Sequence, residues 1–206
     1  IEDDPSSHKL LHQRARILRQ LERYSEAAAD YSEMFRLGNE DGLVFTEWCA
    51  SLVAAGDLEQ YRQRCRELLN RYADAEMAVT LAAICALAPD AVEDWQLPLE
   101  LAERGMATGK IGPGKDDPAA WLLYRSGKYE EAAGRLAEAP ESEVGNVETA
   151  RQLWLAMAYF QIDRIEPART LLQQADAWVQ ENPDCWLRNK LLLAEAKTLI
   201  APAVTQ

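Results

Sequence analysis

Pairs of small residues twelve positions apart recur along this chain and constrain its fold more than any other feature. The pairs are Ala15/Ala27, Ala120/Ala132 and Ala156/Ala168. Small side chains let two helices approach closely, because no long side chain holds the backbones apart. A spacing that recurs in this way is typical of a repeated helical hairpin. Cys49 and Tyr61 have the same spacing but keep only the first small position.

The last pair lies in the clearest of these hairpins. A helix is predicted over residues 149–161, and a polar turn at Asp163 follows it. Pro167 suits the start of the next helix, because the first turn of a helix leaves that N–H unpaired in any case. The second helix has an apolar stripe at three- and four-residue spacing, formed by Ala168, Leu171, Leu172, Ala175 and Trp178. The dipeptide Asn182-Pro183 ends it.

The sequence as a whole predicts an all-α protein. It contains no run of alternating β-branched residues and no Asn-Gly or Asp-Gly turn between alternating segments. Of the 206 residues, 48% are hydrophobic, which is enough for a substantial core. We expect a single domain over residues 1–206, an α-solenoid of antiparallel helix hairpins with a C-terminal capping helix. The predicted hairpins cover residues 8–37, 41–72, 75–107, 117–139 and 148–182, and the capping helix covers 184–200.

Two of these hairpins have particular features. The first helix is expected to bury a stripe formed by Leu10, Leu11, Ala15, Leu18 and Leu21. The third hairpin is irregular, because residues 75–87 are apolar on several sides and Pro98 lies inside its second helical stretch, which could therefore start at Gln96 or Leu97. Residues 108–116 are glycine-rich, so a loop is predicted there. They resemble a phosphate-binding loop only in spacing, because Asp116 stands where such a loop needs Ser or Thr and no strand precedes it.

The hairpins resemble the tetratricopeptide repeat, a helical hairpin of about 34 residues with a characteristic set of small and aromatic positions. The residues that fit its pattern are Leu11, Ala15, Leu18, Ala27 and Tyr31; Phe45, Trp48, Cys49, Leu52, Tyr61 and Cys65; Ala120, Leu123, Ala132 and Leu136; and Leu155, Ala156, Tyr159, Ala168, Leu172 and Ala175. Residues 75–115 depart from it. The resemblance implies a solenoid whose first helices present a concave surface to protein partners.

A narrower resemblance concerns whole segments. The blocks YRQRCRELLNRY, AAICALAPDAVEDW, AAWLLYRSGKYEEAAGRL and LWLAMAYFQIDRIEPARTLLQQADAWV look like the tetratricopeptide-like tails of large planctomycete proteins. In those proteins the tail follows a serine/threonine kinase domain or a WD40 array. The resemblance implies an accessory domain of a signalling protein, with any kinase chemistry outside these residues, since the kinase signatures are absent here. The chain also starts at Ile1 without Met, so a piece of a longer protein is expected.

Charge and cysteine content narrow the class of partner and the compartment. The net charge of −12 and the pI near 4.7 disfavour nucleic acid and anionic membranes as partners. No apolar run reaches the length of a membrane span. The cysteines are widely spaced, without a C-x-x-C motif, at Cys49, Cys65, Cys85 and Cys185. Reduced cysteines in the core of a cytoplasmic protein are therefore expected.

The inventory of reactive side chains does not favour catalysis. His8 and His12 are the only histidines, and their four-residue spacing on a helix could hold a metal. No obvious ligand completes the set, although acidic residues at positions 2–4 are near in sequence. A Ser-His-Asp triad is not expected, because these two terminal histidines are the only candidate bases. We predict that the chain is not an enzyme and has no catalytic residue, cofactor or metal.

Two sets of residues are candidates for a partner-binding surface. Arg14, Arg16 and Arg19 form a basic face on the first helix, and Trp95 and Trp186 are the tryptophans that could be exposed at an interface. The other tryptophans at repeat positions, Trp48, Trp121, Trp154 and Trp178, are expected mostly in the core. Tetratricopeptide grooves that grip a C-terminal carboxylate use an Asn that aligns here with Arg16, Ala50, Trp121 and Met157, so that mode of binding is not supported.

These observations predict a non-catalytic protein–protein interaction or scaffold module. The expected partner is a protein or peptide, or the remainder of a larger parent protein. The alternative is a regulatory domain that senses a small molecule in a pocket near the irregular third hairpin, residues 75–107. An open groove with exposed aromatic or charged residues favours the first function, and an enclosed pocket favours the second.

Overall fold

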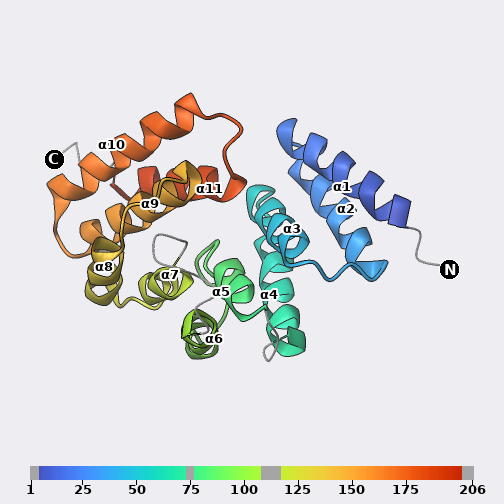
Figure 1. The fold of residues 1–206 in the computed structure, drawn as a ribbon, viewed down its shortest axis with the longest axis horizontal. Coiled ribbons are helices and arrows are strands. Elements are labelled where there is room, and N and C mark those ends of the chain that lie inside the picture. Colours follow the sequence, from blue (N-terminus) through green and yellow to red (C-terminus); the bar gives the residue numbers. More distant parts are fainter. Residues whose placement is uncertain (1–4, 73–76, 108–116, 201–206) are drawn as a thin grey trace.

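The computed structural model describes residues 5–72, 77–107 and 117–200, and within these ranges the chain forms helices and no strand. Successive helices pack as antiparallel pairs along an arc, with α1 and α2 at one end and α9 and α10 at the other (Figure 1). The predicted all-α solenoid is therefore confirmed. The helices are α1 (Pro5–Gln20), α2 (Tyr24–Arg36), α3 (Gly42–Ala54), α4 (Leu58–Tyr72), α5 (Ala78–Cys85), α6 (Gln96–Ala107), α7 (Pro118–Arg125), α8 (Tyr129–Glu138), α9 (Gly145–Gln161), α10 (Ile165–Glu181) and α11 (Leu187–Ile200).

The small residues that suggested the repeat lie at the centre of the hairpins. Ala15, Ala27, Ala120, Ala132, Ala156 and Ala168 are all fully buried. The helices that carry them pack against each other as α1 with α2, α7 with α8, and α9 with α10. An alanine at each position allows this close contact, because a longer side chain would have to displace the facing helix.

The hairpin turns also keep the repeat register. Glu22, Gly56, Gly127 and Asp163 each lie seven residues after the first member of a twelve-residue pair. All four have a positive φ, between 56° and 81°. A left-handed residue is a common way to end a helix and reverse the chain, and glycine adopts it without steric cost. Glu22 and Asp163 adopt it without being glycine, so the packing of their hairpins must hold these two turns in place.

In two hairpins, a local side chain fixes where the first helix begins. The Asp41 carboxylate accepts a hydrogen bond from the Leu43 N–H at 2.7 Å at the start of α3. The Asp117 carboxylate accepts one from the Ala120 N–H at 3.1 Å at the start of α7. Each bond satisfies an N–H that has no partner within the helix. Pro118 follows Asp117 as the first residue of α7, where its missing N–H costs no hydrogen bond.

In the second hairpin, Tyr61 stands twelve residues after Cys49, where the other hairpins have alanine, and the structure shows why. Its ring is fully buried next to the end of α5. Its hydroxyl lies 2.9 Å from the carbonyl oxygen of Ile84 and 3.0 Å from that of Cys85, and it accepts from the Ala88 N–H at 3.3 Å. The last carbonyls of a helix lack partners within that helix. Tyr61 supplies one from the neighbouring hairpin and so joins α4 to α5.

The third hairpin is irregular, and its first helix is shorter than predicted. Helix α5 covers only Ala78–Cys85, and α6 begins at Gln96. Pro98 therefore lies in the first turn of α6, where its missing N–H costs no hydrogen bond. The predicted start of this hairpin at residue 75, the predicted loop 108–116 and both ends of the chain, 1–4 and 201–206, lie outside the described residues.

Helix α11 lies inside the arc (Figure 1). It covers the last hairpin by packing on α9 and α10, as a capping helix should, and it also reaches across the arc to contact α3. Near its start, the Asn189 side-chain amide donates to the Asn146 carbonyl oxygen of α9 at 2.9 Å. The C-terminal helix thus occupies part of the concave side that the first helices were expected to present to a partner.

Candidate protein-binding surface

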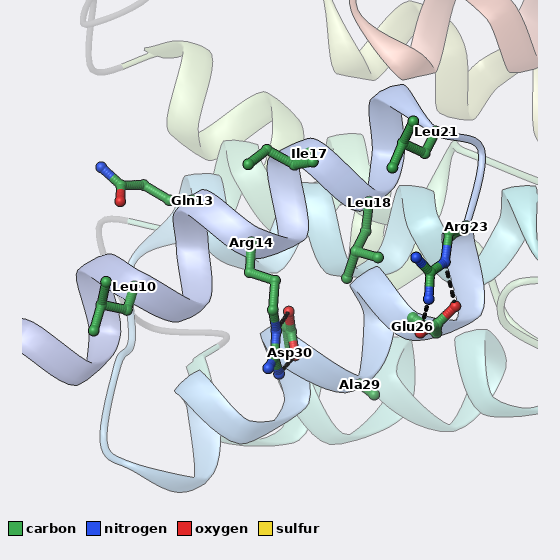
Figure 2. Close-up of a pocket in the computed structure, with 10 residues that line it drawn as sticks. All are labelled: Leu10, Gln13, Arg14, Ile17, Leu18, Leu21, Arg23, Glu26, Ala29 and Asp30. Carbon is green, nitrogen blue, oxygen red and sulfur yellow. Dashed lines mark hydrogen bonds and ion pairs between the residues drawn. The ribbon is translucent and has the colours of Figure 1, made fainter.

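The outer face of the first hairpin, at the open end of the arc, carries the candidate site. Helix α1 and the turn that follows it expose three large apolar side chains there, with Leu10 at 65%, Ile17 at 55% and Leu21 at 59% of their accessible surface. They line a groove of about 750 Å³ between α1 and α2, here termed the end groove, whose ten lining residues are labelled in Figure 2. Single exposed apolar residues are ordinary, but several that line one groove are typical of an interaction site.

The prediction that Leu10 and Leu21 are buried was wrong. Helix α1 has apolar residues on two sides, and the side that contains Ala15 and Leu18 packs on α2. Leu10, Ile17 and Leu21 follow one another at spacings of seven and four, so they form a second stripe. This stripe was visible in the sequence. Nothing in the pattern of α1 alone indicated which of the two stripes would be covered.

A comparison within the molecule explains the exposed stripe. Ile17 lies two positions after Ala15, and the residues at the same position of later hairpins are Ser51, Leu122 and Ala158, all fully buried. In those hairpins the first helix packs against the second helix of the hairpin before it, as α3 on α2, α7 on α6 and α9 on α8. Within the described residues no helix precedes α1. The end groove is therefore the equivalent of a repeat-to-repeat interface that no described residue covers.

Arg14, one residue before Ala15, also indicates that the end groove is an uncovered repeat-to-repeat interface. Its side chain is 66% exposed, whereas the equivalent residues Trp48, Ala119 and Leu155 are buried. The ring of Trp48 lies 5.6 Å from that of Phe35 on α2, which shows that this position faces the preceding hairpin. The position of Arg14 on α1 is therefore one that would face a preceding hairpin, although its side chain binds Asp30 of α2.

Two ion pairs neutralise the polar groups of the end groove. The Arg14 Nε donates to the buried Asp30 carboxylate at 2.8 Å (Figure 2). The Arg23 guanidinium binds Glu26 through two hydrogen bonds of 2.6 Å. These bonds lower the pKa of Glu26, so the carboxylate stays ionised and paired at neutral pH. The pairs leave an apolar groove whose charges cancel.

The three predicted arginines do not form one continuous face. Arg14 reaches α2, while the Arg19 guanidinium lies 2.6 Å from a Glu47 carboxylate oxygen on α3. Arg16 is exposed to solvent. Arg14 is therefore the only one of the three in the end groove, and the part that the others play in binding stays a prediction.

The two predicted tryptophans lie in other parts of the molecule. Trp95 is partly buried against the core just before α6. Trp186 precedes α11 and is 46% exposed, with the Arg188 guanidinium 5.0 Å from its ring centre. The structure therefore does not bring the five predicted residues together. The remaining tryptophans at repeat positions follow the prediction, since Trp48, Trp121 and Trp154 are in the core and Trp178 is partly buried.

A polar cluster joins the first three helices beside the end groove. The Glu47 carboxylate of α3 lies 3.0 Å from the His12 Nε2 and 2.6 Å from the Arg19 Nη1, both on α1, and accepts from the Tyr31 hydroxyl of α2 at 2.9 Å. Burial opposes ionisation of Glu47, but the Arg19 charge and these hydrogen bonds outweigh it and lower the pKa of Glu47 below 4.5. The cluster therefore fixes how α1 and α2 sit on α3.

The cluster predicts a pH dependence of stability. A carboxylate whose pKa is lower in the folded state stabilises the fold above its unfolded pKa, and this contribution is lost as the pH falls through the folded pKa. Glu47→Gln should lower the free energy of unfolding by about 1–2 kcal/mol at pH 7. Urea unfolding between pH 7 and pH 3 should show this difference shrinking below about pH 4.5. Glu59→Gln, at an exposed position on α4, should match the wild type throughout. A difference that stays constant down to pH 3 contradicts the role of the Glu47 charge.

Helix α11 covers part of the concave side, so less of that surface is accessible to a partner. Trp121 of α7 is buried with the Arg188 guanidinium of α11 4.9 Å from its ring centre. Arg125 of α7 is 3% exposed and forms two hydrogen bonds to the Glu195 carboxylate of α11. In the C-terminal half of the arc these contacts place α11 over residues that face inward. The open end groove is consequently the more accessible apolar surface.

The described residues contain no group of three or more His, Cys, Asp or Glu side chains placed to hold a metal. His12 is engaged by Glu47. Cys49, Cys65 and Cys85 are buried, and burial raises the pKa of the Cys49 thiol, so it stays protonated and unreactive. Cys185 is only partly buried, unlike the prediction for it. Among the described helices, none combines the length and the apolar character that a bilayer crossing requires.

Comparison with known proteins supports the fold. No protein-family model matches the chain, and no curated protein does. A crystal structure of a thermophilic TPR protein from Thermus thermophilus matches 93% of this chain and 100% of its own, at 16% identity and a TM-score of 0.53. A mutant of MamA matches more weakly, at 16% identity and a TM-score of 0.42, over 83% of this chain and 96% of its own. The C-terminal part of a TPR repeat-containing protein from Cytophaga hutchinsonii matches at 18% identity and a TM-score of 0.41, over 96% of this chain and 76% of its own. The chain therefore has the α-solenoid fold found in tetratricopeptide repeat proteins.

Proposed function

We propose that this chain is a non-catalytic protein-binding module that receives its partner in the end groove. The observation that carries the proposal is the exposure of Ile17, when every described residue at its repeat position is buried under a neighbouring hairpin. An apolar side chain gains free energy when a partner removes it from water. Three such side chains in one groove give a partner the apolar centre that stable interfaces have.

The wider context of the module is also a proposal. The resemblance to planctomycete tails supports an accessory domain of a larger signalling protein, in which the partner could be another part of the same parent. The alternative function, a small-molecule sensor near the third hairpin, has no specific observation in its favour. The end groove is open to solvent, which fits a protein partner better than an enclosed small molecule.

The proposal is tested by affinity capture with matched variants. Ile17→Asp/Leu21→Asp places two charges in the end groove and should remove a partner that the wild type captures. Both positions are exposed, so the variant should lose little stability. The control is Leu97→Asp, which changes an exposed leucine of α6, distant from α1 in Figure 1, and should capture the same partner as the wild type. A partner that is retained by the double variant rules out the end groove as the binding site.

A further inference from the structure

Helix α1 is chemically unlike the chain to which it belongs. The chain has a net charge of −12, yet α1 contains Lys9, Arg14, Arg16 and Arg19 and no acidic residue. Arg14 and Arg19 are paired with carboxylates of α2 and α3. The Arg23/Glu26 pair at the end of the groove is also balanced. The remaining positive charge on α1 thus comes from Lys9 and Arg16.

Lys9 and Arg16 flank the apolar stripe. Each immediately precedes a stripe residue, Leu10 or Ile17, and so lies about 100° from it around the helix. Both side chains are exposed, and neither has an ion-pair partner within residues 5–72, 77–107 and 117–200. Among the described residues, the acidic residue nearest to α1 in sequence is Glu22, in the turn beyond Leu21, while Asp30 and Glu47 contact α1 and are paired with Arg14 and Arg19. The rim of the end groove is therefore basic along most of α1.

The shape of the groove indicates what it holds. At each described repeat-to-repeat interface, the occupant of the equivalent surface is an α-helix of the preceding hairpin. We propose that the end groove binds an acidic amphipathic helix, whose apolar stripe covers Leu10, Ile17 and Leu21 and whose carboxylates pair with Lys9 and Arg16. This inference rests on the proposed function and adds the chemical class of the partner.

A second copy of this chain fits the groove less well. If two end grooves met face to face, they would bring the basic rims of two α1 helices together, and like charges at an interface oppose association. The helix at the other end of the arc, α10, offers no matching apolar stripe, because none of the exposed large apolar side chains of the described residues lies on it. Charge complementarity therefore favours an acidic partner over self-association.

Two synthetic peptides test the proposal directly. Both are fluorescently labelled helices of 16 residues, the length of α1, with leucines at helical spacing. One has Glu at its polar positions and the other has Lys. The acidic peptide should bind the wild-type protein about tenfold more tightly at low salt, and the preference should fall as salt is added. Non-specific attraction to a chain of net charge −12 would favour the Lys peptide, so a preference for Glu must be local.

Variants assign the binding to the groove and its rim. Ile17→Asp/Leu21→Asp should abolish binding of the acidic peptide. Lys9→Glu/Arg16→Glu should abolish its preference over the Lys peptide. Lys128→Glu/Lys190→Glu makes the same change in net charge at exposed positions elsewhere in the chain and should keep the preference. Circular dichroism should show that each variant retains the helical content of the wild type.

Each other outcome has a defined meaning. Equal or tighter binding of the Lys peptide overturns the acidic-helix proposal. So does the absence of binding by both peptides, and affinity capture then decides separately whether the groove binds protein at all. A wild-type dimer in sedimentation experiments that Ile17→Asp/Leu21→Asp converts to a monomer identifies a second copy as the occupant and also overturns it. Peptide binding that survives in this variant excludes the end groove.

Discussion

Trp154→Ala should lower the free energy of unfolding by about 3–5 kcal/mol, the largest effect that we expect from a single substitution. Trp154 is 1% exposed on α9. Its ring stacks on Trp121 of α7 at 5.9 Å and 15°, meets the edge of Tyr124 at 5.4 Å, and lies under the Arg125 guanidinium at 4.7 Å. Alanine would leave a cavity where α7 and α9 meet, and it would remove the aromatic surface beneath Arg125.

Trp186 provides the matched control, because it is the same residue type at a position that is 46% exposed. Trp186→Ala should cost less than about 1 kcal/mol in the same urea titration. If Trp154→Ala cannot be purified as a folded protein, Trp154→Phe keeps an aromatic ring in place and should lose only part of the stability. Equal losses for Trp154→Ala and Trp186→Ala would contradict the view that the stacked tryptophans form the centre of the C-terminal core.

Glu195→Ala should have the second largest effect, a loss of about 2–3 kcal/mol. The Arg125 side chain is 3% exposed, and the Glu195 carboxylate binds two of its nitrogens, one of them at 2.7 Å. The remaining hydrogen bond of Arg125, from Nε to the Ala86 carbonyl oxygen at 3.0 Å, cannot balance its charge. Removal of Glu195 therefore leaves a buried guanidinium without a carboxylate. The loss stays below that of a fully buried pair because Glu195 itself is 29% exposed.

Two comparisons separate this charge effect from a loss of packing. Arg125→Met/Glu195→Met removes both charges, and it should be less destabilised than Glu195→Ala, because no unpaired charge remains buried. Glu33→Ala breaks the exposed Arg36–Glu33 pair and should change stability by less than about 0.5 kcal/mol. If Glu195→Ala behaves like Glu33→Ala, then the Arg125–Glu195 pair contributes little to the position of α11.

The two predictions share Arg125 of α7, which lies over Trp154 and is paired with Glu195 of α11 on the concave side. A helix that is buried there by apolar contacts and tied by the Arg125–Glu195 pair is part of the folded core. A partner that needed the whole concave surface would have to displace it, at the cost of these contacts. This is the physical reason why the proposed binding site lies at the open end of the arc and not in its centre.

The repeating unit could be predicted from the order of residues in the chain. The spacing of Ala156 and Ala168 is local information, because both residues belong to one hairpin and their size alone decides how closely its helices pack. The same holds for Asp117 and Pro118, because Asp before a helix and Pro in its first turn are both favoured by the local backbone chemistry. Such features depend on neighbours in sequence, so they can be identified without coordinates.

Which surfaces are covered could be learned only from the way the helices pack. Helix α1 has two apolar stripes, and only the position of α2 shows that Ala15 is inside while Ile17 is outside. Likewise Arg125 and Glu195 are separated by 70 residues, and no local pattern indicates that they meet. Burial and ion pairing between distant segments arise from how the hairpins stack and where α11 lies, and a periodic pattern along one helix contains no information about either.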